Sequence, residues 1–341
     1  MQKKLIALAV AGLVSAPAFA QSNVQIYGVV DAGVAYGKGD DNKFRGVNSG
    51  LLSASRIGFR GTEDLGNGLK AVFTLEYGID VDNGQSFGDR ARQSFVGLQG
   101  GFGFIGLGRQ YSPGHNIIGN LDHFGGSAAF APHLKLSGAA GATIANAGAG
   151  RINNAISYKS PNMSGFSVEA MYAFGEDDDQ SNAAGNRDRN NLLGLGGQYK
   201  NGGLTAGLVY HKRDGGAADD QKEWMAGAGY DFGVVAVNGI YQQVKVGSDK
   251  DKIYTVNAKV PVTSAGAILV GYSKLNAEVS DEDATSWTLA YTHSLSKRTT
   301  AYAGYNRVSN DDLQNRVAGT GLAAETGENS SGFVVGVRHT F

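Results

Sequence analysis

The chain has 341 residues, of which 52 are Gly and 5 are Pro, and it contains no Cys. The absence of Cys excludes disulfides, thiolate metal sites and thiol nucleophiles, and a formal charge of −1 without a basic cluster gives no support for nucleic-acid binding. Many Gly and few Pro, with 15 Tyr and 15 Phe, favour β-structure with tight turns.

The first twenty residues have the pattern of a secretory signal peptide. Lys3 and Lys4 precede an apolar run from Leu5 to Val14, and the small-residue motif AFA ends at Ala20. The run is too short to span a bilayer. We therefore expect cleavage after Ala20 and a mature chain of residues 21–341, with a buried core helix as the alternative for this segment.

The rest of the chain is dominated by strand-like alternation. In VQIYGVVDAGVAYG, from Val24 to Gly37, one alternating set of positions is apolar throughout and the other includes polar residues. No later stretch approaches eighteen consecutive apolar residues, so we predict no transmembrane helix. We predict about sixteen strands, which begin near Val24, Leu51, Leu69, Arg90, Phe102, Arg151, Gly165, Asn190, Leu204, Lys222, Val234, Lys252, Gly266, Ala284, Thr299 and Ser331.

The connections between these strands alternate in length. Short ones such as GG and NGG are typical of hairpin turns, whereas KGDDNKFRGVNSG, EDDDQSNAAGNRDR and AEVSDED are longer and polar, and the last two are acidic. Short turns on one rim and long loops on the other are typical of outer-membrane barrels. The acidic loops are either simply solvated or bind divalent cations at the level of lipopolysaccharide.

One connection is much longer than the others. Residues 111–150 alternate weakly, and their second half is rich in Gly and Ala. So long a connection is either functional or disordered. The two hypotheses are a loop folded into the barrel, which narrows it, and a surface loop.

A soluble sandwich and a membrane barrel both show alternation, so other features must decide between them. About sixteen strands in one meander, strands of nine to eleven residues and aromatics near strand ends favour the barrel. Sixteen strands leave an aqueous lumen. We predict an all-β, 16-stranded antiparallel transmembrane β-barrel whose last strand pairs with the first and places Phe341 in the periplasmic aromatic girdle.

Several motifs resemble those of a known family. The runs SRIGFRGTEDLGNGLKAVFTLEYG, RQSFVGLQGGFGFIGLGRQYSPG and RINNAISYKSPNMSGF, with the terminal VRHTF, are similar to the general porins of β-proteobacteria. The resemblance implies a homotrimer of sixteen-stranded barrels, an inward third loop and passive diffusion of small hydrophilic solutes. It also implies that Phe341 is part of the signal read by the barrel assembly machinery. We expect outer-membrane lipid and lipopolysaccharide as partners, and no cofactor or metal.

The resemblance also implies a basic cluster at the pore constriction. The matching positions are Arg56 in SRIGF, Arg92 in RQSF and Arg151 in RINN. Alternation also predicts that Arg56 and Arg151 face the lumen, because their apolar neighbours have the opposite strand parity. Arg92 likewise has the opposite parity to Phe95. Arginine rings favour anions, so we expect anion-favouring diffusion.

Three further residues are weaker members of this predicted constriction. Arg109 in LGRQ fits the family but shares parity with Ile105 and Leu107, so we place it at a strand end where alternation lapses. Arg307 in YNRVSN is a weak candidate. Asp122 lies in the long loop, but its match to the family is imperfect, and the acid that faces the arginines is left open.

Other hypotheses remain at this point. The arginines could form a salt-bridge lattice that only holds the loop. The barrel could be an enzyme, an adhesin or a ligand-specific channel, although no sharp catalytic motif is present. GFGFIG matches a dinucleotide motif, but it spans a predicted hairpin and lacks the following helix. The six His residues have no metal-ligand spacing.

Overall fold

The protein is described from a computed structural model, which covers residues 23–84, 86–137, 142–145, 148–175, 190–215, 219–319, 321–323 and 325–341. The expected signal peptide and the acidic connection 176–189 lie outside the described residues. Within this part of the chain, no helix is both long and apolar enough to cross a membrane.

Antiparallel strands make up most of the described chain and belong to a single sheet. They are β1 (Asn23–Lys38), β2 (Lys43–Ser49), β3 (Arg56–Gly66), β4 (Leu69–Ile79), β5 (Ser86–Gly100), β6 (Gly103–Tyr111), β7 (Arg151–Lys159), β8 (Phe166–Ala173), β9 (Leu192–Asn201), β10 (Leu204–Arg213), β11 (Gln221–Asp231), β12 (Ala236–Val246), β13 (Asp249–Pro261), β14 (Gly266–Asn276), β15 (Ala284–Ser294), β16 (Thr299–Asn310) and β17 (Ser330–Thr340).

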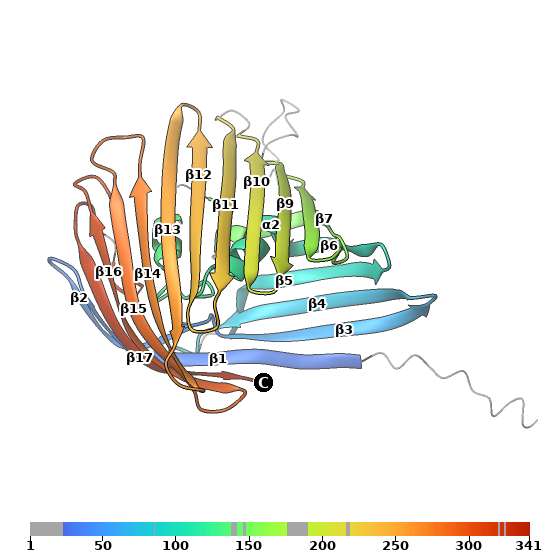
Figure 1. Ribbon diagram of the computed structural model, residues 1–341, viewed down its shortest axis with the longest axis horizontal. Helices are drawn as coiled ribbons and strands as arrows, with labels where there is room; N and C mark the ends of the chain where they lie inside the picture. Colours follow the sequence, from blue (N-terminus) through green and yellow to red (C-terminus); the bar gives the residue numbers. More distant parts are fainter. Residues whose placement is uncertain are drawn as a thin grey trace, which may run out of the picture.

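The sheet closes into a barrel through β1 (Figure 1). On one side β1 pairs with β17, with Val34 opposite Val335. On the other side its first half pairs with β3 and its second half with β2, which lie end to end and occupy one position. The barrel therefore has sixteen strand positions, and the predicted fold class is confirmed.

The segment between β2 and β3 corrects one prediction. Residues 38–50 were expected to be a long loop and residues 51–55 to start a strand, but β2 occupies most of the first stretch. Residues 50–55, which we name the inward segment, leave the wall, and Leu51 and Leu52 are buried against Phe130 and Phe124 in one cluster. Their apolar side chains are buried by the long connection, a contact that alternation along a strand does not reveal.

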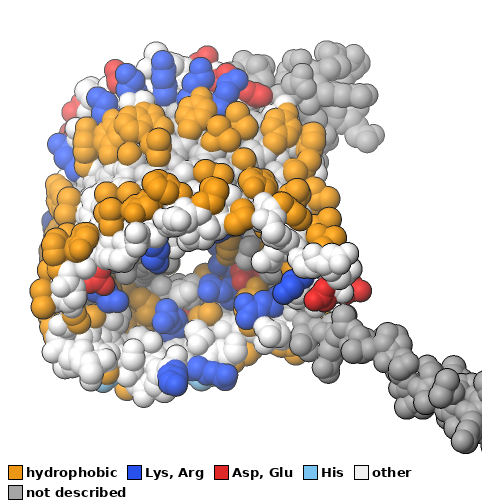
Figure 2. All heavy atoms as spheres, turned by 45° about the vertical axis from the view of Figure 1, so that its right-hand side comes forward, with side chains coloured by type: hydrophobic (Ala, Val, Ile, Leu, Met, Phe, Trp, Pro, Cys, Tyr) orange, Lys and Arg blue, Asp and Glu red, His pale blue; other side chains and the backbone are white. Residues whose placement is uncertain are grey.

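Alternation separates the two faces of the wall as predicted. On β1 the outward Val24, Ile26 and Val34 are exposed, whereas Asp31 and Ala35 are completely buried. The same pattern recurs around the barrel, and Figure 2 shows bands of hydrophobic side chains on the outer wall. Apolar residues outside and polar residues inside are what a lipid solvent and an aqueous lumen require.

The described residues of the long connection 111–150 pack against the inner side of the barrel wall. The connection contains α2 (Pro113–Leu121), α3 (Pro132–Ser137) and the 3-10 turn η2 (Gly148–Gly150), and Figure 1 shows α2 behind the front strands. Ile117, Ile118 and Leu121 of α2 pack against buried residues of β10, β11 and β12. We call residues 111–150 the inner loop. The prediction that this connection is folded inward agrees with these contacts.

Candidate functional site

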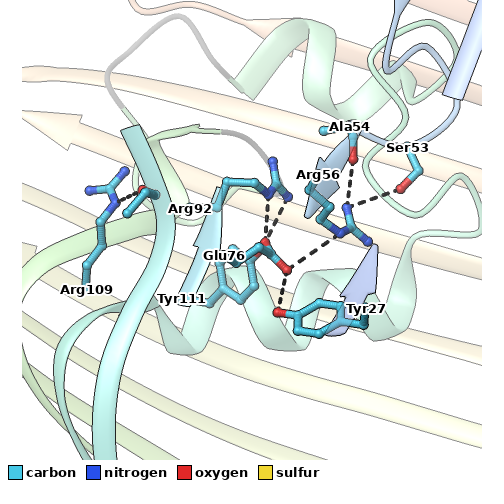
Figure 3. Close-up of polar contacts among 9 residues, drawn as sticks. Tyr27, Ser53, Ala54, Arg56, Glu76, Arg92, Arg109 and Tyr111 are labelled. Atoms are coloured by element: carbon cyan, nitrogen blue, oxygen red, sulfur yellow. Dashed lines mark hydrogen bonds and ion pairs between the residues drawn. The ribbon is translucent and has the colours of Figure 1, made fainter. Parts of the chain in front are cut away.

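Glu76 lies at the centre of a group of polar side chains in the lumen (Figure 3). Its Oε1 lies 2.7 Å from Arg92 Nε, and its Oε2 lies 3.6 Å from Arg56 Nε. Tyr27 donates a hydrogen bond to Oε2 at 2.9 Å and Tyr111 donates one to Oε1 at 3.2 Å. The carboxylate is 3% exposed, and the two cations and two phenols offset the cost of burying its charge.

A β-bulge directs Arg92 toward Glu76. Along β4 and β5, Glu76 pairs with Gln93 and Tyr77 pairs with Ala91, so Arg92 is an extra residue without a partner on β4. Such a bulge changes the direction of the side chains around it.

The bulge also corrects an expectation about Phe95. Strict alternation places Phe95 on the opposite face from Arg92, yet Phe95 lines an interior cavity beside Tyr111. Its ring meets the ring of Phe104 edge-on, with the centroids 5.8 Å apart. Arg92 and Phe95 both face inward because the extra residue resets the alternation between them.

The inward segment positions Arg56. This residue begins β3 directly after the segment, and its Nη1 donates to the Ala54 carbonyl at 3.0 Å and to Ser53 Oγ at 3.4 Å. Asp31 Oδ2 in turn accepts the N–H groups of Leu52 at 3.1 Å and Ser53 at 2.7 Å. The buried carboxylate of Asp31 therefore fixes the backbone that holds the guanidinium of Arg56.

Tyr111 connects Arg151 and the inner loop to this group. The Arg151 guanidinium carbon lies 6.0 Å from the centroid of the Tyr111 ring, and Arg92 Nη2 donates to the Tyr111 hydroxyl at 3.2 Å. His115 of α2 stacks on Tyr111 with centroids 3.9 Å apart. Burial, followed by the charge of Arg151, lowers the pKa of His115 to about 4, so the imidazole is neutral at pH 7.

Two predicted constriction residues lie apart from this group. Arg109 donates to the Ala91 carbonyl at 2.6 Å and bonds to the Asn153 side chain, and Figure 3 shows it to one side of the residues around Glu76. Arg307 is exposed and pairs with Trp287, which is 42% exposed on the outer wall. Arg307 was therefore placed wrongly, because Asn306 and Val308 carry the inward positions of β16.

The carboxylate of Asp122 also bonds to groups outside the cluster around Glu76. It accepts the N–H groups of Phe124 and Gly126, both at 3.0 Å, and its Oδ1 lies 3.4 Å from Asn257 Nδ2 on β13. It thus stabilises a turn of the inner loop. The acid that faces the arginines is Glu76, which the sequence analysis did not single out, although it has the polar, inward parity of β4.

A buried network fastens the inner loop to the opposite wall and was also missed. Glu223 of β11 accepts hydrogen bonds from Thr143 N at 2.7 Å, Thr143 Oγ1 at 2.9 Å and Ile144 N at 3.1 Å. His211 accepts from Gly114 N at 3.2 Å and contacts Thr143 Oγ1 at 2.8 Å. Both ends of the inner loop are therefore held by β10 and β11.

The same network reaches α3. His133 contacts Gln242 Oε1 and Thr255 Oγ1, each at 2.9 Å. Gln242 Nε2 also donates to the Ile144 carbonyl at 3.0 Å. Every ring nitrogen and amide of this set has a partner, and a fully satisfied buried network is rigid.

The charges in the lumen group are unbalanced. Within the described part of the chain, Glu76 is the only carboxylate within 4 Å of Arg56, Arg92 or Arg151. The described residues also contain no group of three or more His, Cys, Asp or Glu that could hold a metal. What this arrangement supplies is positive charge in the lumen, beside the inner loop.

Comparison with known sequences identifies the family. The family described as Gram-negative porin matches residues 7–313. Outer membrane porin protein 32 of Delftia acidovorans is 38% identical over 359 residues and covers 100% of both chains. Major outer membrane protein P.IB of Neisseria gonorrhoeae is 37% identical over 214 residues, which cover 60% of this chain and 56% of that protein.

Solved structures agree. An anion-selective porin from Comamonas acidovorans has a TM-score of 0.82 and 34% identity, and it covers 94% of this chain and 100% of its own. OmpT of Vibrio cholerae in its trimer form has a TM-score of 0.69 at 18% identity, which shows the fold alone. The resemblance to general porins is confirmed: the chain belongs to the Gram-negative porin family and is an outer-membrane diffusion porin.

Proposed function

We propose that this porin favours anions and that the arginines around Glu76 set the preference. The observation that carries the proposal is the excess of positive charge, with Arg56, Arg92 and Arg151 near a single carboxylate. Charged rings in pores select by sign, and a narrow lumen with low-dielectric walls focuses their field. The similar porin from Comamonas acidovorans is described as anion-selective, which supports the proposal.

The three arginines have different roles in this proposal. Arg92 and Arg56 are bound to Glu76, so part of their field is neutralised. Arg151 has no carboxylate within 4 Å among the described residues and lies over the Tyr111 ring. Its planar fork is therefore the one best placed to contact a passing carboxylate or phosphate.

The inner loop is the constriction in this proposal. Its apolar side chains are buried against the wall, and Glu223 and His211 hold it from the opposite side. A loop fixed in this way limits the size of solutes that pass. The solutes are then small and hydrophilic, and they diffuse passively.

The assembly and its partners belong to the same proposal. We infer that the protein forms a homotrimer, as the similarly folded OmpT does in its trimer form. We also infer that the trimer lies in lipid and lipopolysaccharide and that the barrel assembly machinery recognises Phe341. We also infer that the barrel acts as a channel without a catalytic role. A hydrolase assay on the detergent-solubilised protein tests that last point.

Reversal potential in a planar bilayer under a KCl gradient tests the selectivity. We expect stepwise conductance with an anion-favouring potential that falls most in Arg151→Gln, and that also falls in Arg56→Gln and Arg92→Gln. Arg307→Gln, on the outer wall, is the matched control and should keep the wild-type potential. If the wild type prefers cations, or if the reversal potential is unchanged in all three lumen variants, the arginines do not set the selectivity. Their role would then be a salt-bridge lattice that holds the loop.

A further inference from the structure

Six basic side chains surround the lumen at the short-turn end of the barrel, which faces the periplasm in outer-membrane barrels. Five of them lie near that end of their strands, on β4, β7, β9, β13 and β17, and the sixth lies in the middle of β3. Figure 2 shows Lys and Arg side chains around the opening of the barrel. We name the set the periplasmic collar: Arg60, Lys70, Lys159, Lys200, Lys259 and Arg338.

Alternation along the strands places these residues on the lumen face. Lys200 has the parity of Gln198, whose Oε1 accepts a hydrogen bond from Asn120 of the inner loop at 3.1 Å. Lys259 has the parity of Asn257, which is 1% exposed and reaches the inner loop. Residues two apart on a strand share a face, so both lysines face inward.

The remaining members follow the same rule. Lys70 has the parity of Glu76 on β4, and Arg338 has the parity of Val334, which belongs to the interior cluster of β17. The Arg60 guanidinium lies 5.0 Å from the ring centroid of Tyr27, whose hydroxyl bonds to Glu76. The collar is therefore continuous with the lumen and does not belong to the lipid-facing wall.

Acidic side chains compensate the collar only in part. Lys159 pairs with Glu169 at 2.9 Å, whereas the other five have no carboxylate within 4 Å in the described part of the chain. Asp64 and Asp231 lie at the same end, and each accepts the N–H of a turn glycine at 2.8 Å. Both acids keep their charge, and Asp64 is paired with Lys70 across β3 and β4. Six cations against Glu169, Asp64 and Asp231 (6 − 3) therefore leave the collar with a net charge of +3.

The connections at the opposite end of the barrel have the reverse sign, whereas the strand ends beneath them carry basic residues such as Lys212, Lys222 and Lys245. These connections are rich in acids, which in the described residues are Asp40, Asp41, Asp80, Asp82, Asp214, Asp219, Asp220, Glu278, Asp281, Glu282, Asp283, Asp311, Asp312, Glu325 and Glu328. The outer connections are thus acidic, whereas the collar at the periplasmic mouth is basic.

We propose that the periplasmic collar is a second selectivity element, in series with the arginines around Glu76, and that it makes the anion preference depend on the direction of the salt gradient. The proposal rests on the anion preference proposed above for the constriction. It adds residues and a measurable asymmetry that the constriction alone does not supply.

Salt screening provides the physical reason. The collar lysines 70, 200 and 259 are exposed, and the field of exposed charges reaches about 10 Å at 0.1 M salt but only about 3 Å at 1 M. When the KCl solution on the periplasmic side is dilute, the electrostatic field of the collar therefore extends across the mouth of the pore. When that solution is concentrated, the salt screens the field. The arginines around Glu76 are buried (Arg92) or partly buried (Arg56 and Arg151), so they are screened less and act in both cases.

The test requires channels of known orientation. The chain has no Cys, so Lys70→Cys introduces a unique thiol at the collar. An anionic thiol reagent attached to a polymer too large to pass through the pore, added to one compartment, changes the current only from the periplasmic side and so reports orientation. A cationic reagent on the same thiol restores the charge and should restore the wild-type potential.

Reversal potentials are then measured with the dilute KCl solution first on the periplasmic side and then on the outer side. We expect the anion-to-cation permeability ratio to be about twofold higher with the dilute solution on the periplasmic side. The variant Lys70→Gln/Lys200→Gln/Lys259→Gln should lose that difference. In both gradients it should show the lower permeability ratio that the wild type has with the dilute solution on the outer side. The matched control is Lys222→Gln/Lys245→Gln/Lys250→Gln, whose residues pair across β11, β12 and β13 on the outer face, and it should behave as wild type.

Each failure has a distinct meaning. Equal ratios in the two gradients, or a difference that survives in the collar variant, overturn the proposal. Arg151→Gln can lower the anion preference in both gradients and still leave the difference between the gradients unchanged. That result concerns the constriction alone and leaves the collar proposal standing. If the triple variant does not yield channels, the charge reversal at Lys70→Cys gives the same answer on a folded pore.

Discussion

Phe341 and Gly28 pair at the point where the barrel closes. Each donates its N–H to the carbonyl of the other, at 3.1 Å in both directions. The Phe341 ring lies over Gly28, so that a Cβ there would be 2.4 Å from Cζ of the ring and 2.6 Å from the Arg56 carbonyl. The final residue of the chain thus continues the ladder of β17 against β1, and only Gly leaves room for its ring.

Gly28→Ala should therefore weaken closure. Overpacking of this kind costs typically about 1–3 kcal/mol, and we expect a lower urea midpoint and less folded barrel in detergent. Folded and unfolded fractions can be separated by their mobility on gels before and after heating. Gly78→Ala on β4 is the matched control, because nothing lies within 4 Å of its added Cβ; equal behaviour of the two variants would contradict the packing argument.

Glu76→Gln should raise anion preference and lower stability together. Removing the carboxylate leaves Arg92 and Arg56 without their counter-charge, and breaking a buried pair from one side costs about 3 kcal/mol. Reversal potential and urea unfolding measure the two effects. Glu63→Gln, on the exposed part of β3, is the control. An unchanged reversal potential would show that Glu76 does not moderate the pore field.

Glu223→Gln should loosen the inner loop. The carboxylate accepts N–H donors on both oxygens, from Thr143 at 2.7 Å and Ile144 at 3.1 Å, and an amide can present only one acceptor. We expect larger and noisier single-channel conductance because the loop is no longer held against β11. Glu278→Gln, on an exposed connection, should leave the conductance steps as they are. Identical traces for both variants would exclude an anchoring role for Glu223.

His133 should make the folded state sensitive to acid. Burial lowers the pKa of this α3 residue from 6.5 to about 4. Unfolded chains take up the proton below pH 6.5 while the folded imidazole stays neutral, so its contribution is complete above pH 6.5 and is lost as the pH falls toward 4. The loss reaches roughly 3 kcal/mol. Urea midpoints between pH 7 and pH 4.5 measure it.

The control for this titration is His133→Asn. It removes the titrating ring and keeps polar atoms near Thr255 and Gln242. The variant should be less stable at pH 7 but should lose less stability on acidification than the wild type. Parallel curves would assign the acid sensitivity to other groups, such as His115.

Much of the fold could be predicted from the sequence because the membrane imposes a period of two on every strand. Val24, Ile26 and Val34 alternate with inward residues over the whole of β1, and the structure places them outside. Arg56 follows the same rule. The rule fails where an extra residue enters a ladder, as at Arg92, because a bulge is decided by the pairing of two strands and not by either one alone.

The sequence by itself determined the barrel, its strand number, the inward position of Arg56 and the existence of the inner loop, since each follows from local alternation or from the length of a connection. The tertiary structure decided which side chains meet. Glu76 of β4 joins Tyr27 of β1, Arg92 of β5 and Tyr111 of β6, so the group draws on four strands. Asp122 and Arg307 have the residue types expected of a constriction but are held elsewhere, because contacts across a lumen depend on closure and register, which no single segment encodes.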